Sequence, residues 1–95
     1  MEVVETTEFR ITRGALQIVA SEDNMHHQTH ACVFFNDDLV FQQICPESPE
    51  RRARRIYGAL VKCEVDFELT GDDAEDRSRA HAIELVCKLY PRYLG

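Results

Sequence analysis

The hydrophobic pattern is densest between Ala31 and Cys45, where Val, Phe and Ile flank a polar Asn36-Asp37-Asp38 segment. Strand-forming residues on both sides of a turn signal are typical of a β-hairpin. With Asp37-Asp38 as a two-residue loop, the register pairs Phe34 with Phe41, and alternation along each strand predicts two distinct faces. The predicted core face carries Ala31, Val33, Phe35, Val40, Gln42 and Ile44, and the opposite face carries His30, Cys32, Phe34, Phe41, Gln43 and Cys45.

Two shorter strands are predicted before this hairpin. Polar and apolar residues alternate within residues 3–13, most clearly from Glu8 to Thr12, and the apolar run Ala15–Ala20 follows. Because alternation with period two indicates a half-buried strand, these segments predict a first hairpin that turns at Arg13-Gly14. The polar stretch Ser21–Gln28 is predicted to be the longest loop.

The second half of the chain predicts two helices. Ser48-Pro49 is a helix start, with Ser as N-cap and Pro at the first helical position. Asp72 begins the second helix as N-cap, and Pro91 ends it. Its predicted buried stripe is Ala82, Ile83, Val86, Leu89 and Tyr90.

The segment between the helices has two interpretations. Apolar and polar residues alternate from Val61 to Thr70, which predicts a fifth strand with one face in the core. A first helix that runs on to Cys63 is the alternative. The expected fold is therefore one α+β domain over residues 1–95. It has an antiparallel β-sheet of four to five strands with two helices packed on one face, in the order β-β-β-β-α-β-α.

Composition favours a cytoplasmic globular protein. The 95 residues are 44% hydrophobic and 29% charged, and they contain no apolar run of the roughly 20 residues that a membrane helix needs. The acidic N-terminus lacks the basic flank and apolar block of a secretory signal. The four cysteines form no CxxC pair and lie among apolar residues, so they are predicted to be buried, reduced thiols.

A basic cluster stands out against the formal net charge of −6. Arg51, Arg52, Arg54 and Arg55 lie at the start of the first predicted helix, where guanidinium groups can hold an acidic partner or phosphates. We expect these side chains to lie mainly on the flanks and outer side of the helix and to form exposed ion pairs, so that replacing all four leaves the melting temperature nearly unchanged. The acidic chain as a whole makes nucleic acid the less favoured partner.

A polar cluster with possible metal ligands lies at His26, His27, His30 and Cys32. In the predicted register His30, Cys32 and Cys45 share one face, and zinc prefers nitrogen and sulfur ligands. The tight ligand pairs of structural zinc sites are absent from the sequence, and a solvated histidine-rich loop is the simpler interpretation.

The sequence contains none of the common catalytic motifs, such as GxSxG, a P-loop or HExxH. The leading hypothesis is a small, acidic, non-catalytic protein-binding module without a cofactor, a regulator or inhibitor of a larger macromolecular machine. Its predicted partner-binding residues are Arg51, Arg52, Arg54, Arg55, Phe34 and Phe41, and the sheet face that carries the two phenylalanines is expected to meet a protein partner or a second copy. The alternatives are a nucleic-acid-associated protein that uses Arg51–Arg55, or a metal-binding protein that uses His30, Cys32 and Cys45.

Overall fold

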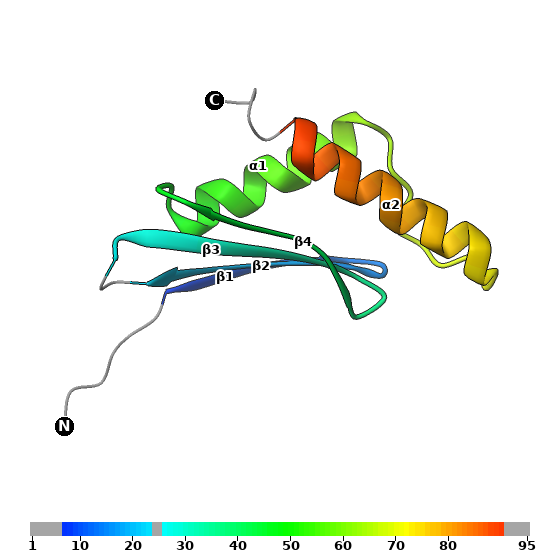
Figure 1. Cartoon of the computed structure of the whole chain (residues 1–95), viewed down its shortest axis with the longest axis horizontal. Coiled ribbons are helices and arrows are strands. Elements are labelled where there is room, and N and C mark those ends of the chain that lie inside the picture. Colours follow the sequence, from blue (N-terminus) through cyan, green and yellow to red (C-terminus); the bar gives the residue numbers. More distant parts are fainter. Residues whose placement is uncertain (1–6, 24–25, 91–95) are drawn as a thin grey trace.

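A computed structural model describes residues 7–23 and 26–90 and folds them into a sheet followed by two helices. The strands are β1 (Glu8–Arg13), β2 (Leu16–Asp23), β3 (Gln28–Phe35) and β4 (Asp38–Cys45), and the helices are α1 (Pro49–Lys62) and α2 (Asp73–Leu89). The sheet is antiparallel in the order β1-β2-β3-β4, and both helices lie on one side of it (Figure 1). The predicted α+β class, with helices packed on one face, is confirmed.

The first hairpin forms where it was predicted, with small differences in its ends. Arg13 pairs with Leu16, so the turn is Gly14-Ala15, and Gly14 takes the positive φ (58°) that glycine adopts without a steric cost. β2 runs on to Asp23 and β3 begins at Gln28, so the polar stretch 21–28 is shorter as a loop than expected. Residues 3–6 of the predicted first strand lie outside the described residues.

The β3–β4 hairpin turns one residue earlier than predicted. Phe35 pairs with Asp38, so the loop is Asn36-Asp37, with φ values of 53° and 65°. Positive φ at both central positions is the type I′ geometry, which matches the twist of the flanking strands. Asn and Asp tolerate this conformation better than most residues, and Asp38 is therefore free to begin β4.

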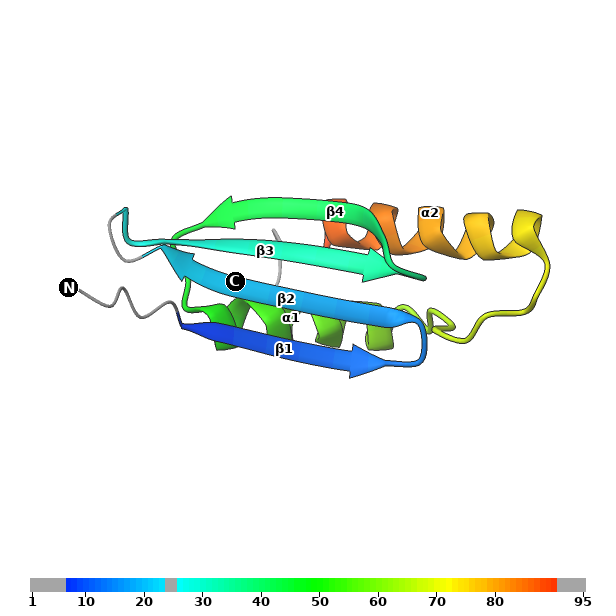
Figure 2. The same ribbon diagram turned by 90° about the horizontal axis from the view of Figure 1, so that it is seen from below.

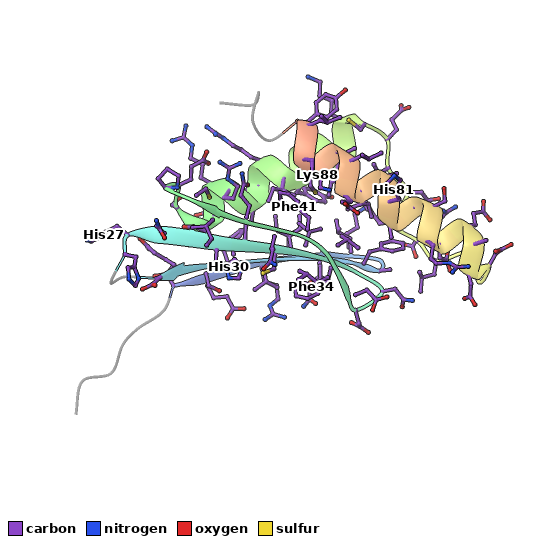
Figure 3. All side chains as sticks on the ribbon, in the orientation of Figure 1. His27, His30, Phe34, Phe41, His81 and Lys88 are labelled. Carbon is purple, nitrogen blue, oxygen red and sulfur yellow. The ribbon has the colours of Figure 1, made fainter. Side chains whose placement is uncertain are left out.

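A β-bulge in β4 shifts the register a second time. Val33 pairs with Phe41 whereas Phe34 pairs with Leu39, which leaves Val40 as the additional residue. Phe41 thus packs toward the helices and Phe34 lies on the other side of the sheet, as Figure 3 shows. The predicted pairing of Phe34 with Phe41 on one face was wrong.

The new register also reverses the remaining side chains of β4. Gln42 and Ile44, which were predicted to be core residues, are exposed, whereas Cys45 is buried on the helix side. A shift of one residue moves a side chain to the opposite face, because alternation along a strand has a period of two. On β3 the prediction was correct, since Ala31, Val33 and Phe35 are all buried.

Helix α1 begins as predicted and ends later. Ser48 is the N-cap, and its hydroxyl accepts a hydrogen bond from the backbone N–H of Arg51, while Pro49 occupies the first turn. The helix continues to Lys62 because Ala59 and Leu60 extend its buried face. Within the described residues the predicted fifth strand does not form, and the alternative of a longer helix is correct.

The segment after α1 is irregular but docks on the sheet. Phe67 is buried, and its carbonyl accepts a hydrogen bond of 2.8 Å from the backbone N–H of Ala15, at the turn between β1 and β2. Val65 also packs against the core. The alternation that predicted a strand therefore marks Val65 and Phe67 correctly as inward-pointing, but Val61 and Leu69 are exposed and the backbone is not paired as a strand.

Helix α2 begins at its predicted cap, Asp72, whose carboxylate accepts hydrogen bonds from the N–H groups of Ala74 and Glu75. Its buried face differs from the prediction. Ile83 and Cys87 are buried and Val86 packs against the core, whereas Ala82, Leu89 and Tyr90 are exposed. The N-terminal part of the helix extends past the end of the sheet (Figures 1 and 2), so only a narrow stripe can be covered. Pro91 lies outside the described residues.

The core lies between the sheet and the two helices. The fully or nearly buried residues of its main cluster are Leu16, Ile18, Ala20, Ala31, Val33, Phe35, Ala53, Ile56, Leu60, Phe67, Ile83 and Cys87. Of the four cysteines, Cys45 and Cys87 are buried as predicted, whereas Cys32 and Cys63 are only partly buried. Burial raises the pKa of the Cys87 thiol to about 12, so this residue is a neutral packing group.

Candidate protein-binding face of the sheet

The sheet face that points away from the helices is not covered by any described part of the chain, and Figure 2 shows the molecule from that side. Residues that pair across antiparallel strands share a face, so three rows of side chains cross this surface. We call these rows the open face: Glu8–Ser21–His30–Ile44, Arg10–Val19–Cys32–Gln42 and Thr12–Gln17–Phe34–Leu39.

Large apolar side chains on the open face are accessible to solvent. Ile44 is 66% exposed and Leu39 is 48% exposed, and both lie on β4 at the edge of the sheet. Val19 and Phe34 are partly covered by their neighbours in the sheet. Sequence reasoning placed Phe34 on this surface but missed Leu39 and Ile44. Alternation along β4 could have placed Leu39, which is two residues before Phe41, on this face. Ile44 reaches it only through the bulge at Val40, which the sequence does not signal.

The open face is close to electrically neutral, although the chain carries −6. The three rows carry two charged residues, Glu8 and Arg10, which form an ion pair of 2.6 Å with each other. Asp23, beyond these rows at the end of β2, points to the same side and pairs with His26 at 2.6 Å. Carboxylates are concentrated elsewhere, at the tip of the β3–β4 hairpin and at the start of α2. A neutral, partly apolar surface on an acidic protein can approach another protein without a large desolvation cost.

Three polar side chains meet on this face. His30 Nε2 lies 3.5 Å from Cys32 Sγ and 3.2 Å from Gln42 Oε1. Burial raises the pKa of the Cys32 thiol above its ordinary value. Next to this group, a hollow of about 410 Å³ is lined by His30, Gln42, Gln43 and Ile44.

The predicted metal-ligand set His30, Cys32 and Cys45 is not brought together. Cys45 pairs with Thr29 and is buried on the helix side, whereas His30 and Cys32 belong to the open face. Among residues 7–23 and 26–90, no cluster of three or more His, Cys, Asp or Glu side chains has the geometry to hold a metal ion. His26 instead pairs with Asp23 at 2.6 Å.

The arginine cluster divides into two pairs with different roles. Arg52 and Arg55 both contact Glu47 Oε1, at 2.6 and 2.5 Å. The Arg52 side chain is only 8% exposed and the Glu47 side chain 18%, so this group holds the start of α1 to the end of β4. The expectation that all four arginines form exposed ion pairs was wrong.

The other two arginines face solvent. Arg51 is exposed, and Arg54 pairs with Glu50 at 3.1 Å while its guanidinium lies 5.4 Å from the centre of the Phe9 ring. The predicted four-arginine surface is thus reduced to two accessible side chains, one of which already has a carboxylate partner. The remaining predicted contact residue, Phe41, lines a separate hollow of about 310 Å³ between β4 and α2.

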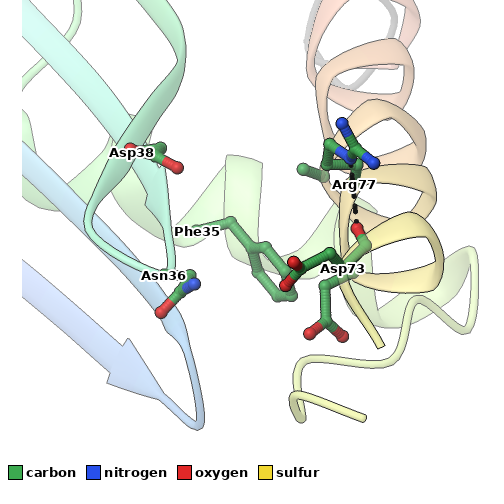
Figure 4. A pocket seen from close by; sticks show the side chains of 7 residues that line it. Phe35, Asn36, Asp38, Asp73 and Arg77 are labelled. Carbon is green, nitrogen blue, oxygen red and sulfur yellow. Dashed lines mark hydrogen bonds between the residues drawn. The ribbon is translucent and has the colours of Figure 1, made fainter. Parts of the chain in front are cut away.

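An acidic hollow lies between the hairpin tip and the start of α2 (Figure 4). It has a volume of about 280 Å³, and its polar lining residues are Asn36, Asp38, Asp73, Asp76 and Arg77. Two of these side chains form local hydrogen bonds: Arg77 Nε donates to the backbone carbonyl of Asp73, and Asp76 accepts two hydrogen bonds from Thr70. These hydrogen bonds all lie within residues 70–77, so they assign Asp76 and Arg77 to the start of α2 rather than to a ligand site.

Neither helix of the described chain has the length and apolar character needed to cross a bilayer. Comparison of the sequence with models of protein families and with curated proteins, and of the structure with solved structures, found no match.

Proposed function

We propose that this protein is a small, non-catalytic protein-binding module that receives a protein partner on the open face of its sheet. The observation that carries the proposal is the position of Ile44 and Leu39, which are large apolar residues exposed on a sheet face that the helices leave uncovered. Burying such a side chain completely contributes about 1.5–3 kcal/mol, so a partner that covers both gains a substantial part of its binding energy there.

The surroundings of these residues suit a protein rather than a nucleic acid. Glu8 and Arg10 of the open face pair with each other, Asp23 beside it pairs with His26, and the remaining side chains of the three rows are apolar or uncharged polar groups. Phosphate binding would instead depend on the arginine cluster, where Glu47 already holds Arg52 and Arg55. Both observations favour a protein partner over a nucleic acid.

A regulatory or inhibitory role in the cytoplasm belongs to the same proposal. The absence of common catalytic motifs from the sequence supports binding without catalysis. The free thiols support a reducing compartment, where disulfides rarely persist.

Site-specific photo-crosslinking tests the proposal in cells that express the protein naturally. A benzophenone amino acid is placed at Gln42, on the open face, and in a matched variant at Glu50, which is exposed on α1. We expect a discrete protein adduct from position 42 and none from position 50. Ile44→Asp should abolish the adduct without changing the circular dichroism spectrum. Equal adducts from both positions, or an adduct that survives Ile44→Asp, would place the binding surface elsewhere.

A further inference from the structure

Two side chains of the open face have the spacing of neighbouring zinc ligands. His30 and Cys32 are two residues apart on β3, so both project from the same face, and Nε2 lies 3.5 Å from Sγ. In a tetrahedral site with Zn–S of about 2.3 Å and Zn–N of about 2.0–2.1 Å, adjacent sulfur and nitrogen ligands are about 3.5 Å apart. The pair therefore needs little rearrangement to bind one ion.

We propose that two copies of this chain pair through their open faces around a shared Zn²⁺ ion, held by His30 Nε2 and Cys32 Sγ of each copy. This inference rests on the proposed function, because it identifies the partner that covers the open face. It replaces the His30/Cys32/Cys45 set that the sequence suggested.

The coordination number supports a second copy. Structural zinc sites have four protein ligands, and two His with two Cys is a common set. One chain supplies two of them on this face, and a two-fold axis through the ion supplies the same two again, since such an interface joins identical patches.

The dimensions of packed sheets agree with this arrangement. Two sheets pack face to face about 10 Å apart, so the ion would lie about 5 Å from each backbone. A cysteine sulfur is one bond beyond Cβ, and adding a Zn–S bond of about 2.3 Å reaches this depth. β3 is an inner strand, so the ion would lie inside the interface, with Val19, Phe34, Leu39 and Ile44 available to pack around it.

Charge balance is also satisfied. Each Cys32 thiol releases its proton to solvent, each His30 binds as neutral imidazole, and the two thiolates cancel the charge of one Zn²⁺. A neutral centre is compatible with an apolar interface. Binding at Nε2 displaces the 3.2 Å contact with Gln42, whose exposed side chain can turn outward.

The experiment uses the full chain, purified without a histidine tag and stripped of metal with a chelator. Zinc is added while sedimentation reports the mass, and the bound metal is counted after gel filtration. We expect a monomer without zinc and a dimer with one zinc ion for every two chains. Co²⁺ in place of zinc should give the visible absorption of a tetrahedral thiolate-ligated centre.

Four variants assign the ligands. Cys32→Ser and His30→Gln should each abolish zinc binding and zinc-dependent dimerisation. Cys63→Ser and His27→Gln are the matched controls, because both residues are accessible to solvent outside the open face, and they should behave as wild type. Zinc binding that survives Cys32→Ser, one zinc ion on each monomer, or no zinc binding at all would overturn the inference.

The test separates this inference from the proposed function. A dimer that forms without zinc but is lost in Ile44→Asp would refute the metal site and support docking on the open face. A crosslink from position 42 to a different protein, with no zinc-dependent dimer, would likewise refute the metal site and support docking on the open face. If neither the crosslink nor the dimer is observed, both proposals are refuted.

Discussion

Phe34 and Phe41 lie on opposite faces of the sheet, although they belong to the two strands of one hairpin (Figure 3). The bulge at Val40 separates them, because it places Phe41 opposite Val33 and Leu39 opposite Phe34. The same shift directs Gln42 and Ile44 to the open face. The composition of the candidate binding surface thus depends on one additional residue in β4.

The type I′ turn at Asn36-Asp37, where the pairing of β3 with β4 begins, can be tested by a glycine substitution. Asp37 has φ of 65°, a conformation that costs most L-residues about 1–2 kcal/mol and glycine almost nothing. Glycine also loses more conformational entropy on folding, which offsets part of this gain. We therefore expect Asp37→Gly to raise the free energy of unfolding by about 0.5 kcal/mol. Asp38→Gly, in the first position of β4, is the control and should lower it. Urea unfolding measures both, and a destabilised Asp37→Gly would argue against this turn.

Two glycines provide a matched pair with opposite expectations. A Cβ at Gly14 would lie 2.7 Å from the carbonyl oxygen of Phe67, and φ there is 58°. Gly14→Ala should therefore lower the free energy of unfolding by about 2 kcal/mol or more. Gly58 lies in α1 with nothing within 4 Å of the added carbon, so Gly58→Ala should raise it by about 1 kcal/mol through helix propensity. If Gly14→Ala were neutral, the docking of residues 65–69 against the first turn would be wrong.

The ion pairs of Glu47 should be important for stability. Removing one partner of a buried ion pair typically costs about 3–5 kcal/mol, because the remaining charge is no longer neutralised. Glu47→Gln should approach that range, since Glu47 serves both Arg52 and Arg55. Arg54→Ala removes an exposed pair with Glu50 and is the control, with an expected change of about 0–1 kcal/mol. Thermal and urea unfolding decide the question, and equal effects of the two variants would mean that burial of the Glu47 group is unimportant.

Asp76 should make stability depend on pH in the acidic range. The backbone N–H of Thr70 and then its hydroxyl donate to this carboxylate, and these bonds lower its pKa. A lowered pKa in the folded state means that the stabilisation is present above pH about 4 and is lost as the pH falls toward the folded-state value. Asp76→Asn should therefore be less stable than wild type near neutral pH, and the difference should shrink below pH about 4.

The control for this experiment is Thr70→Val, which keeps the Asp76 carboxylate and removes the hydroxyl that donates to it. Its loss of stability at pH 7 should be smaller than that of Asp76→Asn and should also shrink toward pH 3. A stability difference for Asp76→Asn that is the same at both pH values would contradict the role assigned to Thr70.

Local signals in the sequence determined most of the elements of this fold. Alternating residues predicted the strands, and Ser48-Pro49 and Asp72 marked the starts of both helices, because caps and periodicity act within a few residues of the chain. These signals also indicated the class, since four strands followed by helices with one apolar stripe pack most simply as a sheet with helices on one side. The inward positions of Val65 and Phe67 were visible in the same way.

Tertiary structure decided which residues form the candidate site. The choice between loops Asn36-Asp37 and Asp37-Asp38, and then the bulge at Val40, depends on how both strands fit the core and the helices above it, which no local pattern specifies. The burial of Arg52 depends on Glu47 meeting the first turns of α1, and the narrow covered stripe of α2 depends on its extension beyond the sheet. The sequence could thus predict that one face of the sheet is uncovered, but only the packed structure identified Leu39, Gln42 and Ile44 as the residues of β4 on that face.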